Sequence, residues 1–474
     1  MAQITPSAGY TLTLRVNIEN IPGALGRLTT AIGRAGGDIG AVDLVEHRGK
    51  IMVRDVTVKC RDESHGQTIV RAVGRVQGVE VRQVSDRTFD IHSAGKITVT
   101  PRFPLKTRDD LSMAYTPGVG RISRAIADEP ERVWELTIKQ NSVAVLTDGT
   151  AVLGLGDVGP EAAMPVMEGK AMLFKEFADI DAYPICARVG NPDELVAVAK
   201  AIAPGFGGIN LEDVAAPACF EVEERLRAEL DIPVFHDDQH GTAVVVLGAL
   251  LNGARVVGRR LEDMTVVFLG MGAAGVACTK LLLHVGIGDV IGCDRNGIVH
   301  TGRTDNMNDQ KRWIAANTNR NGVTGGLDDA LRGADVFVGV SGPNLVKPEW
   351  LAAMSSDAIV FALANPVPEI MPEEVPDNVR IVATGRSDYP NQINNVLVFP
   401  GFFRGLLDSR ASGVTIEMEE AAARALSSVV AETELSEEYI VPSVFDRRVV
   451  DAIATSVKKM AADQGLARLG GRDD

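Results

Sequence analysis

Cysteines and aromatic residues are scarce in this chain of 474 residues, and the cysteines show no regular spacing. No two of the five stand as C-x-x-C, so neither a disulfide framework nor a cysteine-based zinc cluster is predicted. Aromatic residues make up only 5% of the sequence, and the chain has five tyrosines. A phenol group held in a rigid loop is therefore a candidate for chemistry.

The chain also lacks the features of nucleic-acid-binding, membrane and secreted proteins. It has 48 lysines and arginines against 63 acids, a net charge of −15, which argues against nucleic acid or an anionic membrane as a partner. The start MAQITPSAGY has no basic segment followed by an apolar stretch, and no apolar run approaches the ~20 residues that span a bilayer. We therefore expect a cytoplasmic protein of two or three domains.

Two pairs of adjacent carboxylates are the most informative feature that is present. Glu212-Asp213 stands in INLEDVAAP and Asp237-Asp238 in VFHDDQHGT, each after a short apolar run that predicts a buried strand. Adjacent acids repel one another, so four of them in an apolar setting favour a compensating cation. Their ligand atoms are all oxygen, which suits Mg²⁺ or Mn²⁺ better than zinc.

Two other interpretations of these acids stay open. Each pair alone has the composition of a helix cap or of a solvated loop. A zinc site built from His236, Asp238 and His240 is a further alternative, although the two histidines are four residues apart in a segment that contains glycine.

Two further residues carry groups suited to proton transfer. Tyr115 lies in SMAYTPGVG, a loop held by proline and two glycines, where a phenol can donate a proton. Lys170, in EGKAMLF, is expected to open an apolar helix over 171–177, and beside carboxylates a lysine can act as a base. Each residue also has a structural interpretation, the tyrosine as a packed aromatic and the lysine as a snorkelling surface residue.

A dinucleotide fingerprint follows further along the chain. The sequence GMGAAG comes after a predicted strand at 265–269 and opens a predicted helix at 273–283. In such a motif the glycines let the backbone approach a pyrophosphate, which the helix N-terminus then holds. The predicted cofactor-binding residues of the motif are Gly270, Gly272, Ala273, Ala274 and Gly275.

The strand after the fingerprint ends in an acid that bears on the choice of cofactor. Asp294 follows the predicted strand 289–293, and a carboxylate there accepts hydrogen bonds from the ribose hydroxyls, which favours NAD. Arg295 comes next and can turn toward a 2′-phosphate, so NADP remains an alternative. Asn365 follows a later predicted strand, at the edge where ligands bind in open α/β sheets.

A second glycine-rich segment, GLGDVG at 154–159, also fits the fingerprint. It follows a strand-like run at 151–155, but Pro160 and a broken stretch come next instead of a clean helix. We therefore expect a tight turn that shapes the active site. From about residue 415 the sequence predicts two helices that pack back on the body.

The first 88 residues form a separate predicted domain. Their strands and helices follow a βαββαβ pattern, which is a ferredoxin-like arrangement. No cluster of histidines, cysteines or carboxylates converges there, so no catalytic role is expected. The segment NIPGALG at 20–26 resembles the first loop and helix of an ACT domain, a small regulatory module that often binds amino acids. A purely structural appendage is the alternative.

Motifs spread in order over residues 89–405 together resemble the malic enzymes. They are YTPGVG, EGKAMLF, NLED, FHDDQHGT, GMGAAG, FALANP and NQINNVLVFPG. The resemblance implies divalent-metal-dependent oxidative decarboxylation of L-malate to pyruvate and CO₂ with reduction of NAD(P). That chemistry needs one metal, one base and one acid, and the chain offers a candidate for each.

The resemblance also implies roles for individual residues. Lys170 would be the general base and Tyr115 the general acid, with Asp237 beside the metal and near the lysine. The implied metal ligands are Glu212, Asp213 and Asp238.

For malate, the resemblance implies a set of asparagines near the nicotinamide. These substrate residues are Asn365, Asn394 and Asn395. Many larger malic enzymes have an arginine that holds a substrate carboxylate just before the segment ILGLG. This chain has Ala151 at that position, so how the carboxylate is held stays open.

The sequence as a whole predicts an α/β protein of three domains. They are a ferredoxin-like ACT domain at 1–88, an α/β catalytic domain at 89–245 and a Rossmann-type NAD-binding domain with C-terminal helices at 246–474. We expect a homodimer or homotetramer with a small-metabolite effector at the N-terminal domain. Two other functions are alternatives: an oxaloacetate decarboxylase without a redox step, which the fingerprint disfavours, and a non-catalytic nucleotide and effector sensor, which leaves the four carboxylates unexplained.

Overall fold

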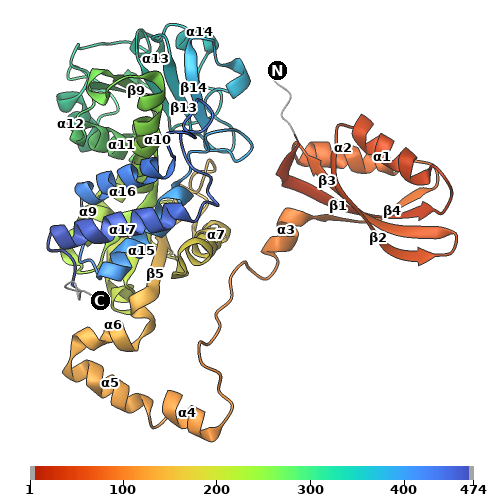
Figure 1. The fold of residues 1–474 in the computed structure, drawn as a ribbon, viewed down its shortest axis with the longest axis horizontal. Helices are drawn as coiled ribbons and strands as arrows, with labels where there is room; N and C mark the ends of the chain where they lie inside the picture. Colours follow the sequence, from red (N-terminus) through yellow and green to blue (C-terminus); the bar gives the residue numbers. More distant parts are fainter. Residues whose placement is uncertain (1–5, 469–474) are drawn as a thin grey trace. The chain divides into compact units, whose positions relative to one another are not determined.

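The structure is a computed structural model that describes residues 6–468. The chain divides into two compact units, Met1–Thr98 and Val99–Asp474. The first unit contains one four-stranded sheet, and the second contains a four-stranded and a six-stranded sheet with helices packed around them (Figure 1). The predicted α/β class is confirmed.

The N-terminal unit has the predicted βαββαβ order. Its antiparallel sheet has the strand order β2-β3-β1-β4, and α1 and α2 cover one face (Figure 1). Strand residues such as Leu14 and Val56 pack against Leu28 and Ile69 of the helices in a core of their own. The elements are β1 (Ser7–Glu19), α1 (Ala24–Arg34), β2 (Asp38–Arg48), β3 (Ile51–Cys60), α2 (Glu63–Val73), β4 (Val79–Asp86) and α3 (Arg87–His92).

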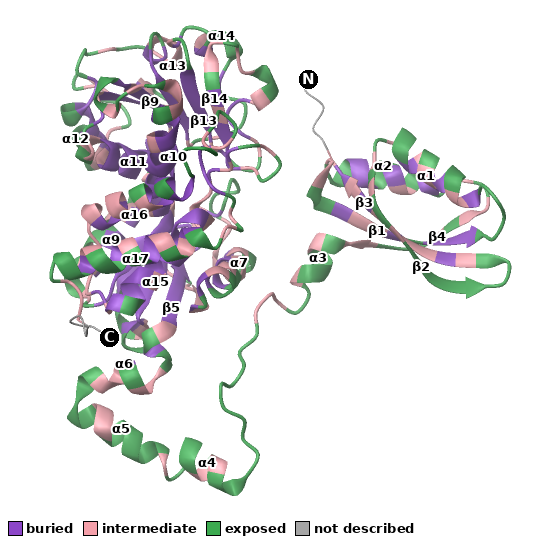
Figure 2. Cartoon of the chain, in the orientation of Figure 1, coloured by how far each residue is buried: buried purple, intermediate pink, exposed green. Residues whose placement is uncertain are grey.

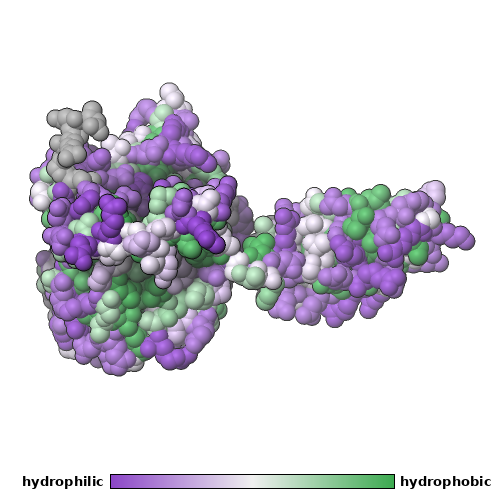
Figure 3. All heavy atoms as spheres, turned by 90° about the horizontal axis from the view of Figure 1, so that it is seen from below, coloured by the Kyte–Doolittle hydropathy of each residue, from purple (hydrophilic) through white to green (hydrophobic). Residues whose placement is uncertain are grey.

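The second unit begins with short helices that bury little of their surface. α4 and α5 contain no buried residue, and Figure 2 colours both mostly as exposed. Apolar side chains such as Met113 and Ile122 therefore face solvent in the single chain. Seen from below, the surface shows apolar groups among polar ones (Figure 3). The helices are α4 (Arg108–Ala114), α5 (Val119–Asp128) and α6 (Val133–Leu136).

A parallel four-stranded sheet carries the acidic pairs. Its strand order is β6-β5-β7-β8, and β5, β7 and β8 are fully buried, as is usual for parallel strands covered by helices. The strands predicted before the two acidic pairs are confirmed as β7 and β8, with α9 between them. The elements are β5 (Ser142–Thr147), α7 (Pro160–Ala178), β6 (Asp181–Cys186), α8 (Pro192–Ile202), β7 (Gly208–Leu211), α9 (Ala218–Glu229) and β8 (Val234–His236).

Two local predictions in this region are wrong. The expected strand before Gly156 is only a bridge between Val152 and Gly156. α7 begins at Pro160 and continues through Pro165, so Lys170 lies within the helix and not at its start. Proline at the first helical position breaks no hydrogen bond, because the N–H there has no partner within the helix.

The second sheet has the order typical of nucleotide-binding α/β folds. Its strands follow β11-β10-β9-β12-β13-β14, all parallel except β11, and α11 comes directly after the central strand β9. The elements are β9 (Thr265–Leu269), α11 (Ala273–His284), β10 (Asp289–Asp294), β11 (Gly297–Ile298), α12 (Asp309–Asn317), α13 (Leu327–Ala330), β12 (Val336–Gly339), α14 (Pro348–Leu351), β13 (Ala358–Ala362) and β14 (Val379–Thr384).

One largely buried helix, α10 (Thr242–Val257), joins the two sheets. It continues a π-helical turn, Asp237–Gly241, and residues of β5 and β9 on either side of it belong to one hydrophobic core. The segment Asp237–Val257 is long and apolar enough to cross a membrane, contrary to the prediction that no apolar run approaches that length. Two-thirds of it (67%) is buried inside the protein, which is the character of a core helix. The expected domain boundary at residue 245 falls inside this helix.

The C-terminal helices pack back on this body, as expected. α15 contacts α7 and α17, while α16 contacts α10 and α17. Buried residues of these helices belong to the same core as α10; Figure 1 shows the helices beside α10. The helices are α15 (Phe399–Ser409), α16 (Ile416–Val429) and α17 (Arg448–Asp463).

Candidate active site

The two acidic pairs lie side by side at the carboxyl ends of β7 and β8. These strands are parallel neighbours with Leu211 paired to His236, so the residues that follow each strand emerge at the same edge. The backbone N–H of Asp213 donates to Oδ2 of Asp238 at 2.8 Å. Glu212, Asp213 and Asp238 each offer a carboxylate oxygen within 4.8 Å of the others, a spacing that suits the ligands of one cation.

Lys170 reaches this cluster from α7. Its Nζ lies 2.5 Å from Oδ2 of Asp237, 2.9 Å from Oε1 of Glu212 and 4.1 Å from the ring centroid of Phe399. The side chain is only 9% exposed, so the snorkelling interpretation is wrong. Among the described residues, Lys170 is the one lysine or arginine that pairs with any of the four acids.

The excess of negative charge raises the pKa values of the acids. Burial and the charge of Asp238 raise the pKa of Asp213 to about 7, against the attraction of Lys170. Burial also raises the pKa of Glu212 well above its usual range, although Lys170 lowers it. Burial alone would lower the pKa of Lys170, but the charges of Asp237 and Glu212 outweigh burial and raise that pKa, so the ammonium stays charged.

Several oxygens in the cluster are buried without a hydrogen-bond donor. They are Oδ2 of Asp213, Oδ1 of Asp237 and Oδ1 of Asn210. A buried oxygen without a donor costs free energy, and a cation satisfies it. The unpaired oxygens, the charge deficit and the all-oxygen ligand set therefore fit Mg²⁺ or Mn²⁺.

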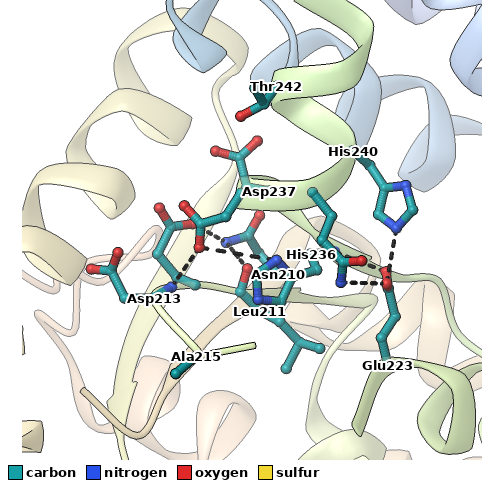
Figure 4. Close-up of polar contacts among 12 residues, drawn as sticks. Asn210, Leu211, Asp213, Ala215, Glu223, His236, Asp237, His240 and Thr242 are labelled. Carbon is teal, nitrogen blue, oxygen red and sulfur yellow. Dashed lines mark hydrogen bonds and ion pairs between the residues drawn. The ribbon is translucent and has the colours of Figure 1, made fainter. Parts of the chain in front are cut away.

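A second buried network holds the π-helical turn after β8, and its central acid, Glu223, lies outside every motif of the sequence. Glu223 of α9 accepts hydrogen bonds from the backbone N–H of His236 at 3.1 Å and from Nε2 of Gln239 at 2.9 Å (Figure 4). Burial by itself raises the pKa of Glu223, but Arg227 and His240 outweigh burial and lower the pKa to about 2. The ionised carboxylate thus fixes the turn that carries two of the acids.

The alternatives of a zinc site and of solvated loop acids are both wrong. Nε2 of His240 lies 2.9 Å from Glu223 and Nδ1 lies 2.8 Å from Glu419 of α16, so both ring nitrogens are engaged. Burial alone would lower the pKa of His240, but the two carboxylates outweigh burial and raise it to about 9, which keeps the ring cationic. Asp213 and Asp237 are buried, which excludes solvated loop acids.

The predicted substrate asparagines lie in loops on the nucleotide-binding side. Asn395 donates through Nδ2 to Oδ2 of Asp237 at 3.1 Å, so it belongs to the acid cluster. Asn394 instead accepts a backbone N–H two residues further on and caps a helical turn. Asn365 lies against the glycine-rich turn, since a Cβ on Gly154 would come within 2.9 Å of its carbonyl oxygen.

Ala151 contributes a backbone contact and no charge. Its N–H donates to the carbonyl oxygen of Asp213 at 2.9 Å, which ties the glycine-rich turn to the acid cluster. Next to it, Oγ1 of Thr150 accepts from the N–H of Ala215 at 2.9 Å. The turn and the acidic loop are therefore held as one piece.

The dinucleotide fingerprint forms the loop that a pyrophosphate requires. Gly270 has φ +113°, and a Cβ there would lie 2.6 Å from the carbonyl oxygen of Val340. A Cβ on Gly275 would lie 1.9 Å from the carbonyl oxygen of Gly270, so both positions need glycine. Gly272, before α11, has open space where a Cβ would stand, which leaves room for a phosphate at the helix N-terminus.

Asp294 lies at the end of β10, as expected, but its carboxylate is not free. Nη2 of Arg303 lies 2.7 Å from both of its oxygens and Nζ of Lys311 lies 2.7 Å from Oδ2. Burial alone raises the pKa of Asp294, but these hydrogen bonds outweigh burial and lower it. The two cations come 9 and 17 residues after Asp294 in a segment without a motif, so sequence reasoning missed them.

Tyr115 is not brought to the acid cluster within this chain. It follows α4 as its C-cap residue and is 67% exposed, so the packed-aromatic interpretation is wrong. Its backbone contacts are local, with Leu111 and Val119. Figure 1 shows α4 and α5 standing away from the two sheets of this unit.

Comparisons with family models match almost the whole chain. The model described as the malic enzyme N-terminal domain matches residues 94–227, and the malic enzyme NAD binding domain matches residues 239–462. An ACT domain matches residues 6–81.

Known proteins resemble the chain over most of its length. The NAD-dependent malic enzyme of Geobacillus stearothermophilus is 53% identical over 463 residues, which cover 97% of this chain and 96% of that protein. The bifunctional malic/malolactic enzyme of Bacillus subtilis is 49% identical over 376 residues, 79% of this chain and 92% of that protein. The malic enzyme structures from Pyrococcus horikoshii and Thermotoga maritima both have a TM-score of 0.76, with 48% and 46% identity. They cover 80% and 79% of this chain, which in turn covers 89% and 99% of them.

Proposed function

The chain belongs to the malic enzyme family, and on that premise we propose that it oxidises L-malate to pyruvate and CO₂ with reduction of NAD. The observation that carries the proposal is the cluster of four carboxylates around Lys170, three of them buried, next to a dinucleotide-binding loop. Oxidation of a hydroxy acid needs a hydride acceptor and a base, and decarboxylation needs a positive charge near the substrate oxygens.

The proposed metal ligands are Glu212, Asp213 and Asp238. Their oxygens lie close enough for one ion, and the chain alone leaves their charge uncompensated. When bound, Mg²⁺ or Mn²⁺ would supply Lewis-acid polarisation of the substrate oxygens. His236 and Gln239 donate hydrogen bonds to Glu223, and these bonds hold the π-helical turn after β8 in place. They thereby preserve the distance between the two acidic pairs.

Lys170 is the proposed base for the C2 hydroxyl proton. To accept that proton the ammonium must first lose one, and the charges of Asp237 and Glu212 oppose this loss. Any compensation of the acids by a positive charge lowers the pKa of Lys170 again. The ability of Lys170 to accept a proton therefore depends on the net charge of the acid cluster. Asn395 holds the same oxygen of Asp237 and so positions the pair.

An absorbance assay with malate, NAD and either Mn²⁺ or a chelator tests this function. We expect NADH to form only when malate, NAD and metal are all present. Pyruvate formation from oxaloacetate without malate-dependent NADH would support a decarboxylase without a redox step. An absence of turnover under every condition would support a nucleotide and effector sensor.

A second copy of the chain is the proposed source of the general acid. The enol product of decarboxylation must be protonated at C3, and Tyr115 is exposed in the single chain. Apolar residues around it, such as Leu111 and Met113, are exposed as well and would be buried by a partner. A homodimer that places α4 of one copy at the acid cluster of the other would satisfy both needs, whether or not two dimers then form a tetramer.

Mixed dimers test this arrangement directly. A heterodimer of Lys170→Ala and Tyr115→Phe chains, isolated through two different affinity tags, contains one intact site only if tyrosine and lysine come from different chains. We expect pyruvate formation at about half of the wild-type rate per dimer. A heterodimer as inactive as the two parent homodimers would show that both residues must come from one chain.

The N-terminal unit is the proposed site of a small-metabolite effector, with an amino acid as the first candidate. In the loop before α1, Nδ2 of Asn20 donates to the carbonyl oxygen of Gly49 at 3.1 Å and lies 3.0 Å from His47, so the loop is tied to the β2–β3 hairpin. An effector changes turnover only if it binds two arrangements of the enzyme with different affinities.

Deletion of residues 1–88 tests the regulatory role. We expect the full-length enzyme to respond to at least one metabolite of an amino acid panel, and the shortened enzyme to lose that response and part of its self-association. Unchanged sedimentation after deletion, together with no response of the full-length enzyme, would favour a structural appendage.

Cysteine usage supports a cytoplasmic location. All five cysteines are free, and four of them are buried. Free thiols are typical of a reducing compartment. We therefore propose that the enzyme works in the cytoplasm.

A further inference from the structure

One buried histidine beside the acid cluster has a ring without a hydrogen-bond partner. His236 is the last residue of β8 and is 0% exposed, and its backbone N–H donates to Glu223 at 3.1 Å. Within residues 6–468, neither Nδ1 nor Nε2 of this ring has a hydrogen-bond partner. Burial of an unpaired polar group costs free energy, so such an imidazole calls for an explanation in the function of the site.

The ring of His236 faces Asp238, one of the three proposed metal ligands. Nδ1 of His236 lies 4.0 Å from Oδ2 of Asp238, which is about 1 Å beyond hydrogen-bond distance. This Oδ2 accepts from the backbone N–H of Asp213 at 2.8 Å. A carboxylate oxygen has two acceptor positions, so the second position on Oδ2 is open to another donor.

Asp238 is also the acid of the cluster that has room to turn. Its side chain is 36% exposed, whereas Glu212, Asp213 and Asp237 are buried. His236 is held by its strand and by the hydrogen bond to Glu223. The side chain of Asp238 can therefore close the gap to Nδ1 while the histidine stays in place.

The position of His236 suits a partner of a metal ligand better than a ligand. Among the described residues, the acids that offer ligand atoms within 4.8 Å of one another are Glu212, Asp213 and Asp238, and His236 is not one of this set. In metal sites, groups outside the ligand set hydrogen-bond the ligating carboxylates and so fix their orientation.

We propose that His236 is a positioning residue for the metal site: its Nδ1–H donates to the open acceptor position on Oδ2 of Asp238. This inference rests on the proposed function, because it concerns a ligand of the proposed metal. The hydrogen bond holds the exposed carboxylate of Asp238 in one orientation. It also joins this ligand to the buried Glu223 network, because the backbone of His236 is bound to Glu223.

Two amide substitutions distinguish a donor at Nδ1 from a residue that only fills space. In His236→Asn the amide nitrogen takes the place of Nδ1, whereas in His236→Gln the amide reaches the place of Nε2 and leaves Nδ1 without a substitute. His236→Leu removes both donors. Melting temperatures without metal show whether each variant folds, and the glutamine variant decides the question if the leucine variant does not fold.

Mn²⁺ binding measures the effect without depending on turnover. The electron paramagnetic resonance signal of free Mn²⁺ gives the dissociation constant for the full-length enzyme and for each variant. We expect His236→Gln and His236→Leu to bind Mn²⁺ about 10–100-fold more weakly than wild type, and His236→Asn to stay within about threefold of it. His284→Gln is the matched control, because that histidine is 29% exposed and pairs with Glu420.

The outcomes separate this inference from the proposed function. Wild-type affinity in His236→Gln would overturn the inference, and so would an asparagine variant that binds Mn²⁺ as weakly as the glutamine variant. If in either case the wild-type enzyme binds Mn²⁺ and malate reduces NAD, only the positioning role fails. If the wild-type enzyme binds no Mn²⁺, the proposed metal site fails, and the inference fails with it.

Discussion

Two groups of buried carboxylates in this enzyme differ in their charge balance. In the acid cluster, four carboxylates share the single ammonium of Lys170. At the nucleotide end, the single carboxylate of Asp294 is shared by Arg303 and Lys311. Both groups lie at the carboxyl ends of parallel strands, so their position in the fold is similar and only their charges differ.

The pKa values record this difference. Burial and like charge raise the pKa of Asp213 to about 7, whereas hydrogen bonds to two cations overcome burial and lower the pKa of Asp294. The presence of buried charge does not by itself indicate a ligand. The sign of the net charge does, because an excess of negative charge fits a cation and an excess of positive charge fits an anion.

The largest expected effect comes from removing the one cation of the acid cluster. Lys170→Ala should lower kcat for malate oxidation by about 10²–10⁴-fold, the range of a general base. Lys175→Ala on the same helix is the control, because that side chain is 56% exposed and pairs with surface acids. A loss of less than tenfold in Lys170→Ala would contradict the role of Lys170 as the general base.

Removing one carboxylate from the acid cluster should abolish metal binding. Asp238→Ala should lower metal-dependent turnover by at least about 100-fold, since even partners outside the metal's own ligand set contribute about 10–100-fold. Mn²⁺ should also no longer raise the melting temperature of this variant, as it does when ligand binds only the folded state. Asp193→Ala, at a carboxylate that is 81% exposed, serves as the control. Turnover of Asp238→Ala at the wild-type rate in Mg²⁺ would refute the site.

Matched amide substitutions in the two clusters should have effects of opposite sign. In metal-free protein at pH 8, Asp213→Asn should raise the free energy of unfolding by about 1–3 kcal/mol, because it removes a repelled charge. The positive φ of Asp213, +54°, suits asparagine equally well. Asp294→Asn should lower that free energy by about 2–4 kcal/mol, since it leaves two buried cations without a carboxylate. Chemical denaturation in a chelator measures both, and effects of the same sign would contradict the comparison.

The pH dependence of stability sharpens the same contrast with a smaller effect. The folded pKa of Asp213 lies above its unfolded value, so between about pH 4 and pH 7 the folded state holds the proton and the unfolded state does not. Stability of the metal-free enzyme should therefore fall as pH rises through this window, by at most about 1.4 kcal/mol per pH unit. Asp213→Asn should show a smaller fall, because the raised pKa of Glu212 still contributes to it. Parallel stability curves for the two proteins would rule out the raised pKa.

The strand ends of the acid site were predictable from the sequence for a local reason. Short apolar runs precede both acidic pairs, and parallel strands bring their carboxyl ends to one edge. The glycines of the fingerprint were predictable as well, because Gly270 and Gly275 have no room for a side chain. In each case the signal and the structure lie within a few residues of one another.

The remaining contacts depend on residues that are distant in the sequence. Lys170 and Asp237 are 67 residues apart, and no pattern in either segment says that they touch. Arg303 reaches Asp294 from the loop after β11 and Lys311 reaches it from α12, and neither segment contains a motif, so the acid was expected to be free. The environment of Tyr115 depends on which surface covers α4, and no local pattern encodes that.

The continuity of α10 limits how this protein can be divided, by an engineer or by evolution. A cut at residue 245 would leave each piece with part of an apolar helix whose neighbours belong to the other piece. Such halves would aggregate in place of folding, so substrate and cofactor specificities cannot be recombined by exchanging them at this point. The first unit has a core of its own and ends before residue 99, so it is a natural module for exchange. The N-terminal unit can thus be exchanged between proteins as a module, whereas the two sheets that α10 joins must stay in one protein.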